Sequence, residues 1–158
     1  MTPSALVAVH RDRGAYASSG MEAQRHFGDR LAEAVERKRT QLVVGLDPRL
    51  DVLPMELRGE AVLGRAAAAS AIARFCKGIS EAVAPYVVAV KPQSAFFEAL
   101  ASDGMRALEE VCDHARSIGL LVLLDAKRGD IGSTARAYAA AYLEPRDGLP
   151  PQIGRAHV

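Results

Sequence analysis

The sequence predicts a parallel α/β fold. Short apolar runs at 41–46, 86–90 and 120–124 alternate with longer segments in which apolar residues recur every three or four positions. Such alternation is typical of parallel sheets with crossover helices. The run at 120–124 is apolar at every position, as in strands that are buried on both faces. We therefore expect three strand–helix units along a chain of 158 residues, a length that suits about one domain.

Two helices are expected around the first strand. Helical spacing of apolar residues begins after Met21 and continues to Lys38, so a helix precedes the strand at 41–46. The same spacing over 61–84 predicts a second helix, which Pro85 ends. The first strand itself is expected to end at 47–48, where proline cannot continue a hydrogen-bonded ladder.

The remaining elements follow the same order. After the strand at 86–90, Ser102 or Asp103 is expected to cap a helix that Gly119 ends. The strand at 120–124 comes next, and a helix is expected over 134–142 after a glycine-containing turn.

Both ends of the chain depart from this pattern. Residues 1–20 are rich in Gly, Ser and Pro, and we expect a disordered or mis-assigned extension with Met21 as the natural start. Residues 145–158 begin as a proline-rich loop, and residues 153–158 back-translate to a common sequencing-adapter read. We expect that segment to be a loop followed by a non-native tail, which leaves 21–144 as the folded unit.

Composition excludes several classes of function. Twenty Lys and Arg against nineteen Asp and Glu give a formal charge of +1, so no overall basic field would hold nucleic acid. No apolar run approaches the roughly 20 residues of a membrane span. Cys76 and Cys112 form no CxxC motif, and we expect two buried, reduced thiols, as suits a cytoplasmic protein.

Charged residues follow all three predicted strands. Asp47 and Lys91 come after the first two, and Asp125 and Lys127 follow the third. Ligands and catalytic residues gather at the carboxyl ends of parallel strands, so these side chains are candidates for one site. Asp125 and Lys127 are two residues apart and should point the same way. A plain ion pair at a strand end is the competing interpretation.

Two other charges lie in the same segment. Asp130 follows a glycine turn, and its simplest role is a carboxylate at the start of the next helix. We expect Arg128 to be an exposed loop cation. No histidine has a partner at metal-binding spacing, so no metal site is expected.

Three segments together resemble a known family. They are 45–49 (GLDPR), 90–98 (VKPQSAFFE) and 125–131 (DAKRGDI). In this order they resemble orotidine 5′-phosphate decarboxylase of the bacterial branch that carries KPQxAFFE. The resemblance covers about 21–144 and implies a (β/α)8 TIM barrel, a homodimer and a reaction without metal or organic cofactor. A complete barrel has about 250 residues, so the expected fold is a partial barrel: three βα units preceded by an N-terminal helix.

The resemblance also implies the roles of individual residues in converting orotidine 5′-phosphate to uridine 5′-phosphate during pyrimidine biosynthesis. Lys127 would stabilise the charge at C6 and deliver the proton, and Asp125 would lie beside the departing carboxylate. Lys91 would hold Asp125 and a ribose hydroxyl in place, and Asp47 would bind ribose. Asp130 and Thr134 would reach the neighbouring subunit's site, and Ile131 would bind substrate.

Two alternatives remain open at this point. A sister enzyme with the same DxKxxD motif decarboxylates a sugar-phosphate keto acid with magnesium. The chain could also be a non-catalytic fragment, since the later barrel strands and the phosphate-binding loops are not in it. We expect this chain alone to be inactive.

Overall fold

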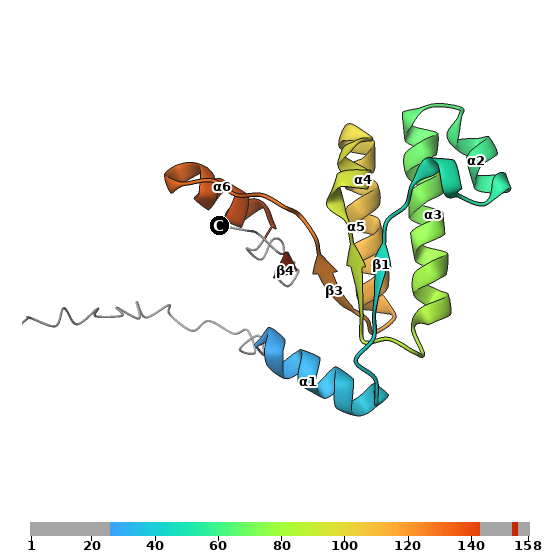
Figure 1. Ribbon diagram of the computed structural model, residues 1–158. Helices are drawn as coiled ribbons and strands as arrows, with labels where there is room; N and C mark the ends of the chain where they lie inside the picture. The colour runs from blue at the N-terminus through green and yellow to red at the C-terminus, as the bar shows by residue number, and fades with distance from the viewer. Residues whose placement is uncertain (1–25, 143–152, 155–158) are drawn as a thin grey trace, which may run out of the picture.

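The computed structural model describes residues 26–142 and 153–154, and it has a parallel sheet (Figure 1). Strands β1 (Val43–Leu46), β2 (Ala89–Pro92), β3 (Leu121–Leu124) and β4 (Ile153–Gly154) lie in that order. Each strand pairs in parallel with its neighbour. The predicted α/β class is therefore confirmed, and all the carboxyl ends of the strands lie on one edge.

Two long helices cover one face of the sheet. Helices α3 (Arg65–Val83) and α5 (Ala101–Ser117) pack against each other and against the strands. Alternate strand residues contribute to this core together with helix residues: Leu46, Val90, Val122 and Leu124 with Ile72, Cys76, Val111 and Cys112. Sequential strand order with both crossover helices on one side is the winding of a barrel, whereas doubly wound sheets have helices on both faces.

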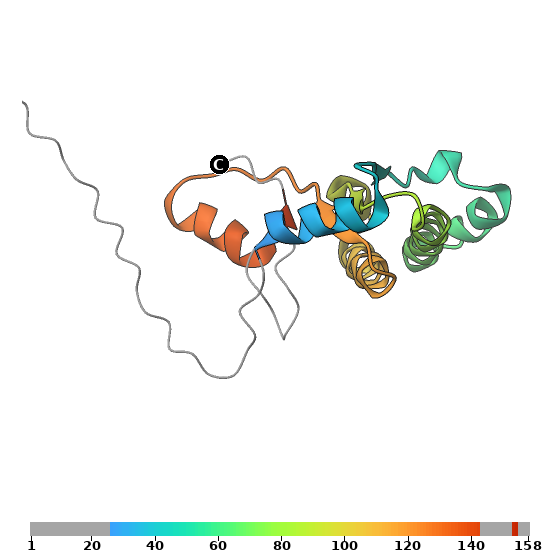
Figure 2. The same ribbon diagram turned by 90° about the horizontal axis from the view of Figure 1, so that it is seen from below.

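Helix α1 (Phe27–Lys38) lies across the amino ends of the strands, away from the charged ends (Figures 1 and 2). Ala34 of this helix is buried with Val88, Ala89 and Leu121. The ammonium of Lys38 donates hydrogen bonds of 2.8 Å to the carbonyls of Ala84 and Val87, and burial lowers the pKa of Lys38. A lysine thus fixes α1 to the end of α3 and the start of β2.

The predicted helix over 61–84 corresponds to α3, which begins four residues later than predicted. Helix α2 (Met55–Ala61) ends before Gly64, whose φ of 130° is not helical, and α3 begins at Arg65. Helix α2, the 3-10 turn η1 (Leu50–Val52) and the short helix α4 (Ser94–Glu98) were not predicted, because three to seven residues are too few to show a period.

The predicted cap of α5 is wrong. The N-cap residue is Leu100, which makes no side-chain cap hydrogen bond. The carboxylate of Asp103 instead forms ion pairs with Arg65 at 2.9 Å and with Arg106 at 2.6 Å. Two guanidinium partners hold Asp103 away from the backbone amides of its own helix. The stop at Gly119 is confirmed by its φ of 79°.

Two strands also differ from the prediction. β2 runs through Lys91 to Pro92, whose carbonyl accepts a hydrogen bond of 2.9 Å from the amide of Asp125. β4 pairs with Leu123 and Leu124 at positions expected to be a non-native tail. Apart from β4, residues 145–158 lie outside the described residues, and so do residues 1–20. The assignments of an N-terminal extension and of a loop with a non-native tail therefore remain predictions. The last described helix is α6 (Gly132–Tyr142).

Candidate active site

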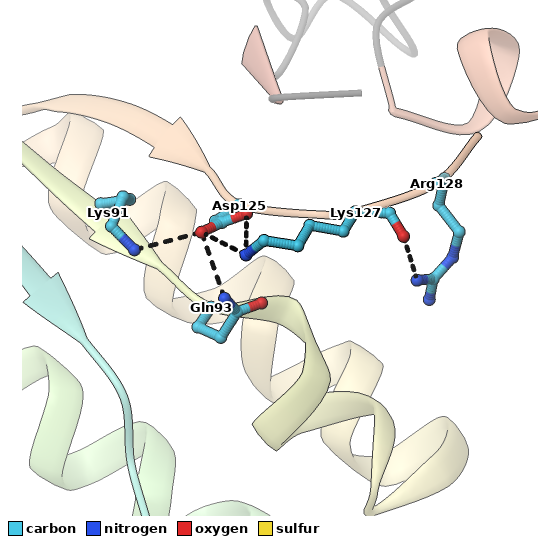
Figure 3. Close-up of polar contacts among 5 residues, drawn as sticks. All are labelled: Lys91, Gln93, Asp125, Lys127 and Arg128. Atoms are coloured by element: carbon cyan, nitrogen blue, oxygen red, sulfur yellow. Dashed lines mark hydrogen bonds and ion pairs between the residues drawn. The ribbon is translucent and has the colours of Figure 1, made fainter. Parts of the chain in front are cut away.

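Three of the predicted residues meet at the carboxyl ends of β2 and β3. Lys91 Nζ lies 3.3 Å from Asp125 Oδ2, and Lys127 Nζ lies 3.0 Å from both oxygens of the same carboxylate (Figure 3). A fourth group, the side-chain amide of Gln93, donates to Asp125 Oδ2 at 3.1 Å. Asp125 is thus the shared acceptor of two cations and one amide.

Strand geometry explains this convergence. Residues two apart on a strand point to the same side, which aligns Lys91 with Gln93 and Asp125 with Lys127. The ladder also continues past the strand ends, because Gln93 and Asp125 form a parallel bridge and the amide of Ser94 donates to the carbonyl of Asp125 at 3.1 Å. The backbone therefore brings the two pairs of side chains together on the face away from α3 and α5.

The cluster keeps its carboxylate ionised. The hydrogen bond from Lys127, followed by that from Lys91, lowers the pKa of Asp125 against the opposing effect of burial. The Asp125 side chain is 13% exposed, whereas that of Lys127 is 59% exposed. Two ammonium groups and one carboxylate leave a local charge of +1, with the Lys127 ammonium accessible. Such a group can stabilise negative charge that develops on a ligand.

A cavity of about 550 Å³ opens beside this cluster. Its wall includes Asp47 after β1, Lys127 and Arg128 after β3, and the segment from Gln93 to Phe96. Asp47, predicted from the first strand end, thus shares a cavity with Lys127 although the two residues are 80 positions apart in the sequence.

The prediction for Arg128 is wrong. Its side chain is 28% exposed, and the guanidinium forms an ion pair with Glu98 at the end of α4. Neither Glu98 nor Gln93 was predicted to belong to the site. For Gln93 a signal existed, because it lies two residues after Lys91 and so on the same side of the strand. For Glu98 the signal was its place at the end of the 90–98 segment that carries the family resemblance, whereas periodicity gave none, because five helical residues do not define a face.

Asp130, Ile131 and Thr134 lie apart from the cluster. Within residues 26–142, no hydrogen bond or ion pair joins Asp130 to Lys127. Asp130 accepts a hydrogen bond of 2.7 Å from the amide of Ile131, which precedes α6, and no acidic residue lies in the first turn of that helix. Ile131 is 84% exposed. Within the described residues the charges that meet are therefore Lys91, Asp125 and Lys127, and Asp130 is not bonded to them.

No group of three His, Cys, Asp or Glu side chains could hold a metal ion within the described part of the chain. The two cysteines are buried and unpaired, and burial raises the pKa of each thiol to about 12. No described helix is long and apolar enough to cross a membrane.

The sequence of the chain matches the model of a known family. The model of the orotidine 5′-phosphate decarboxylase / HUMPS family matches residues 40–146, which include every residue of the cluster. The chain belongs to this family. An orotidine 5′-phosphate decarboxylase of Nocardioides sp. is 48% identical over 123 residues, and one of Rhodopirellula baltica is 50% identical over 118 residues. These matches cover 78% and 74% of this chain.

The family assignment also identifies the architecture. The structure of Leishmania donovani OMP decarboxylase superposes with a TM-score of 0.56 at 40% identity, covering 73% of this chain and 38% of that one. The sheet and its helices are the first units of the family's (β/α) barrel, as the resemblance implied. The chain spans about two fifths of the length of the two curated relatives, 42% and 39%.

Proposed function

We propose that the complete gene product that contains these residues decarboxylates orotidine 5′-phosphate to uridine 5′-phosphate. One observation carries the proposal: the accessible ammonium of Lys127, fixed by Asp125 at 3.0 Å, lies in a cavity at the end of β3 in a chain of this family. Substrate and product place the reaction in pyrimidine biosynthesis. The unpaired thiols of Cys76 and Cys112 suit a reducing compartment, and we propose the cytoplasm.

The chemistry requires a cation at the reacting carbon. The bond between C6 and the carboxylate breaks, CO2 leaves, and its bonding electron pair stays on C6. A fixed ammonium stabilises this charge and then delivers a proton to C6. We assign this role to Lys127, with Asp125 holding its ammonium and lying beside the departing carboxylate. Lys91 holds Asp125 and contacts ribose, and Asp47, which lines the same cavity as Lys127, binds ribose. No metal or organic cofactor enters these steps.

We also propose that the complete product is a homodimer. Asp130 and the exposed Ile131 and Thr134 lie apart from their own chain's cluster, which suits contact with the substrate of a second subunit. Mixing Asp130→Ala with Lys127→Ala protein tests this, because one of the two sites of a mixed dimer would be intact. We expect partial recovery of activity after subunit exchange, and no recovery after verified exchange would refute the shared site.

The Lys127→Ala variant tests the reaction itself. Loss of a group that acts in the transition state should lower kcat by several powers of ten, about 1.4 kcal/mol for each tenfold. Lys77→Ala is the matched control, because it removes an ammonium paired with Glu110 on the helical face, away from the cavity. Near-normal turnover of folded Lys127→Ala protein would contradict the assignment.

Two further assays separate the alternatives. Turnover of orotidine 5′-phosphate that persists in excess EDTA would exclude the magnesium-dependent sugar-phosphate reaction as the main activity. The 158-residue chain should be inactive and marginally folded, because no described helix covers the side of the sheet opposite α3 and α5 over Val43. This apolar strand residue is 41% exposed. A sharp, cooperative thermal transition with turnover from this chain alone would contradict that expectation.

A further inference from the structure

Glu98 and Arg128 form an ion pair beside the proposed reacting groups. Arg128 Nη2 contacts Glu98 Oε2, and the two side chains are 28% and 27% exposed. The second carboxylate oxygen, Oε1, is buried and accepts no hydrogen bond within the described part of the chain. Because a partly buried charge is costly without a partner, the ion pair with Arg128 stabilises the Glu98 side chain in this position.

Arg128 connects three parts of the structure. Besides the ion pair to α4, its Nη1 donates to the carbonyl of Lys127 at 3.2 Å, and its guanidinium lies 6.0 Å from the ring centroid of Tyr142 in α6. The hydrogen bond to Glu98 raises the pKa of Arg128, so its charge is constant at any working pH. The Arg128 guanidinium therefore links the backbone of Lys127 to Glu98 in α4, and it stays charged at any working pH.

The same helix is attached to Asp125 at its other end. Gln93, directly before α4, donates to the Asp125 carboxylate, and Ser94, the first residue of α4, donates its amide to the Asp125 carbonyl. Residues 125–128 are thus bound to residues 93–98 at two points, one at each end of α4. The Lys127 side chain is long and mostly exposed, so the position of its ammonium depends on how well this backbone is held.

We propose that Glu98 and Arg128 are positioning residues for Lys127. The pair fixes the segment after β3 against α4, and the ammonium of Lys127 then stays where negative charge develops. The inference rests on the proposed decarboxylation. Misplacing a reacting group by about 1 Å reduces rates by up to about 100-fold, so loss of the pair should act on the chemical step.

Glu98→Gln in the complete gene product is the primary test, because Glu98 does not line the cavity. We expect kcat to fall about 10- to 100-fold with KM changed less than about threefold. Glu98→Asp should recover part of the loss. The double variant Glu98→Gln/Arg128→Met should be no slower than the slower single variant, because both changes break one interaction. Asp113→Asn is the matched control: it breaks the ion pair to Arg116 on α5, and kcat should not change.

The outcomes separate this inference from the proposed function. A parent protein without decarboxylase activity refutes the proposed function and this inference with it. An active parent with unchanged kcat in folded Glu98→Gln protein overturns only the positioning role. A raised KM in Arg128→Met with no effect of Glu98→Gln also overturns it, because Arg128 would then contact substrate directly. Glu98→Gln leaves the Arg128 charge unpaired, and this variant could fail to fold for that reason. The double variant also removes the Arg128 charge, and an unchanged kcat in folded double variant would then overturn the positioning role.

Discussion

Substitution of Gly104 by alanine should destabilise the fold because α4 leaves no room for a side chain. A Cβ at Gly104 would lie 1.8 Å from the carbonyl oxygen of Phe97 and 2.7 Å from its carbonyl carbon. Ordinary contact begins near 3.4 Å, so the α4 backbone would have to retreat by roughly 1.5 Å. The Phe97 carbonyl also accepts a hydrogen bond of 2.9 Å from the amide of Leu100, which such a shift would disturb.

The magnitude follows from opposing effects. Overpacking of this kind costs about 1–3 kcal/mol, and loss of the backbone hydrogen bond adds about 1 kcal/mol. Alanine recovers about 1 kcal/mol through its higher helix propensity. The net expectation is about 1–3 kcal/mol of lost stability. Gly78→Ala is the matched control: it lies within α3 with no atom near the new Cβ, so it should gain about 0.5–1 kcal/mol.

Urea denaturation of the complete gene product, followed by circular dichroism, measures both variants. Gly104→Ala should shift the midpoint to lower urea and Gly78→Ala to higher urea. Because a displaced α4 moves Gln93 and Glu98, Gly104→Ala should also lower kcat. A Gly104→Ala midpoint equal to or above that of the parent would refute the close approach of α4 and α5.

Three further predictions concern burial and charge. Lys38→Met should cost about 1.5–3 kcal/mol in urea denaturation, because it removes hydrogen bonds from a charged donor to two carbonyls; an unchanged midpoint would refute that role. Cys76 and Cys112 should resist a disulfide reagent in native protein at neutral pH, since both pKa values are near 12; rapid labelling without unfolding would contradict their burial. The lowered pKa of Asp125 means that its ion pairs stabilise the fold above the ordinary value of 3.8 and lose that effect as pH falls through the lower folded value. The stability difference between the parent and Asp125→Asn should therefore persist from pH 7 to about 4 and disappear at lower pH, and a difference already lost at pH 6 would refute this.

Much of the fold could be predicted because its signals are local. Strands at 41–46, 86–90 and 120–124 have apolar runs bounded by Pro or Gly, and the long helices have many turns over which a period is visible. The charges at the strand ends could also be located, because the rule that parallel strands share one carboxyl edge brings Lys91 and Asp125 together without knowledge of packing.

The rest depended on contacts between distant residues. Asp103 does not cap α5, because Arg65, 38 positions earlier, provides a stronger partner than a backbone amide. Arg128 is not a free loop cation, because Glu98 lies 30 positions away on a helix too short to predict. Ion pairs between distant residues are not visible in periodicity, so the charged side chains were the residues whose environment was predicted least well.

The donors around Asp125 explain why a neutral residue belongs in this site. Within the described residues, its Oδ2 accepts hydrogen bonds from Lys91, Gln93 and Lys127, while Oδ1 accepts one from Lys127 only. A carboxylate has about four lone-pair positions, so the remaining capacity of Asp125 is on Oδ1. A third cation in place of Gln93 would raise the local charge from +1 to +2 and would compete with Lys127 for the same carboxylate. The amide of Gln93 orients Asp125 without adding charge, so Lys127 remains the cation best placed to respond to charge that develops in the cavity.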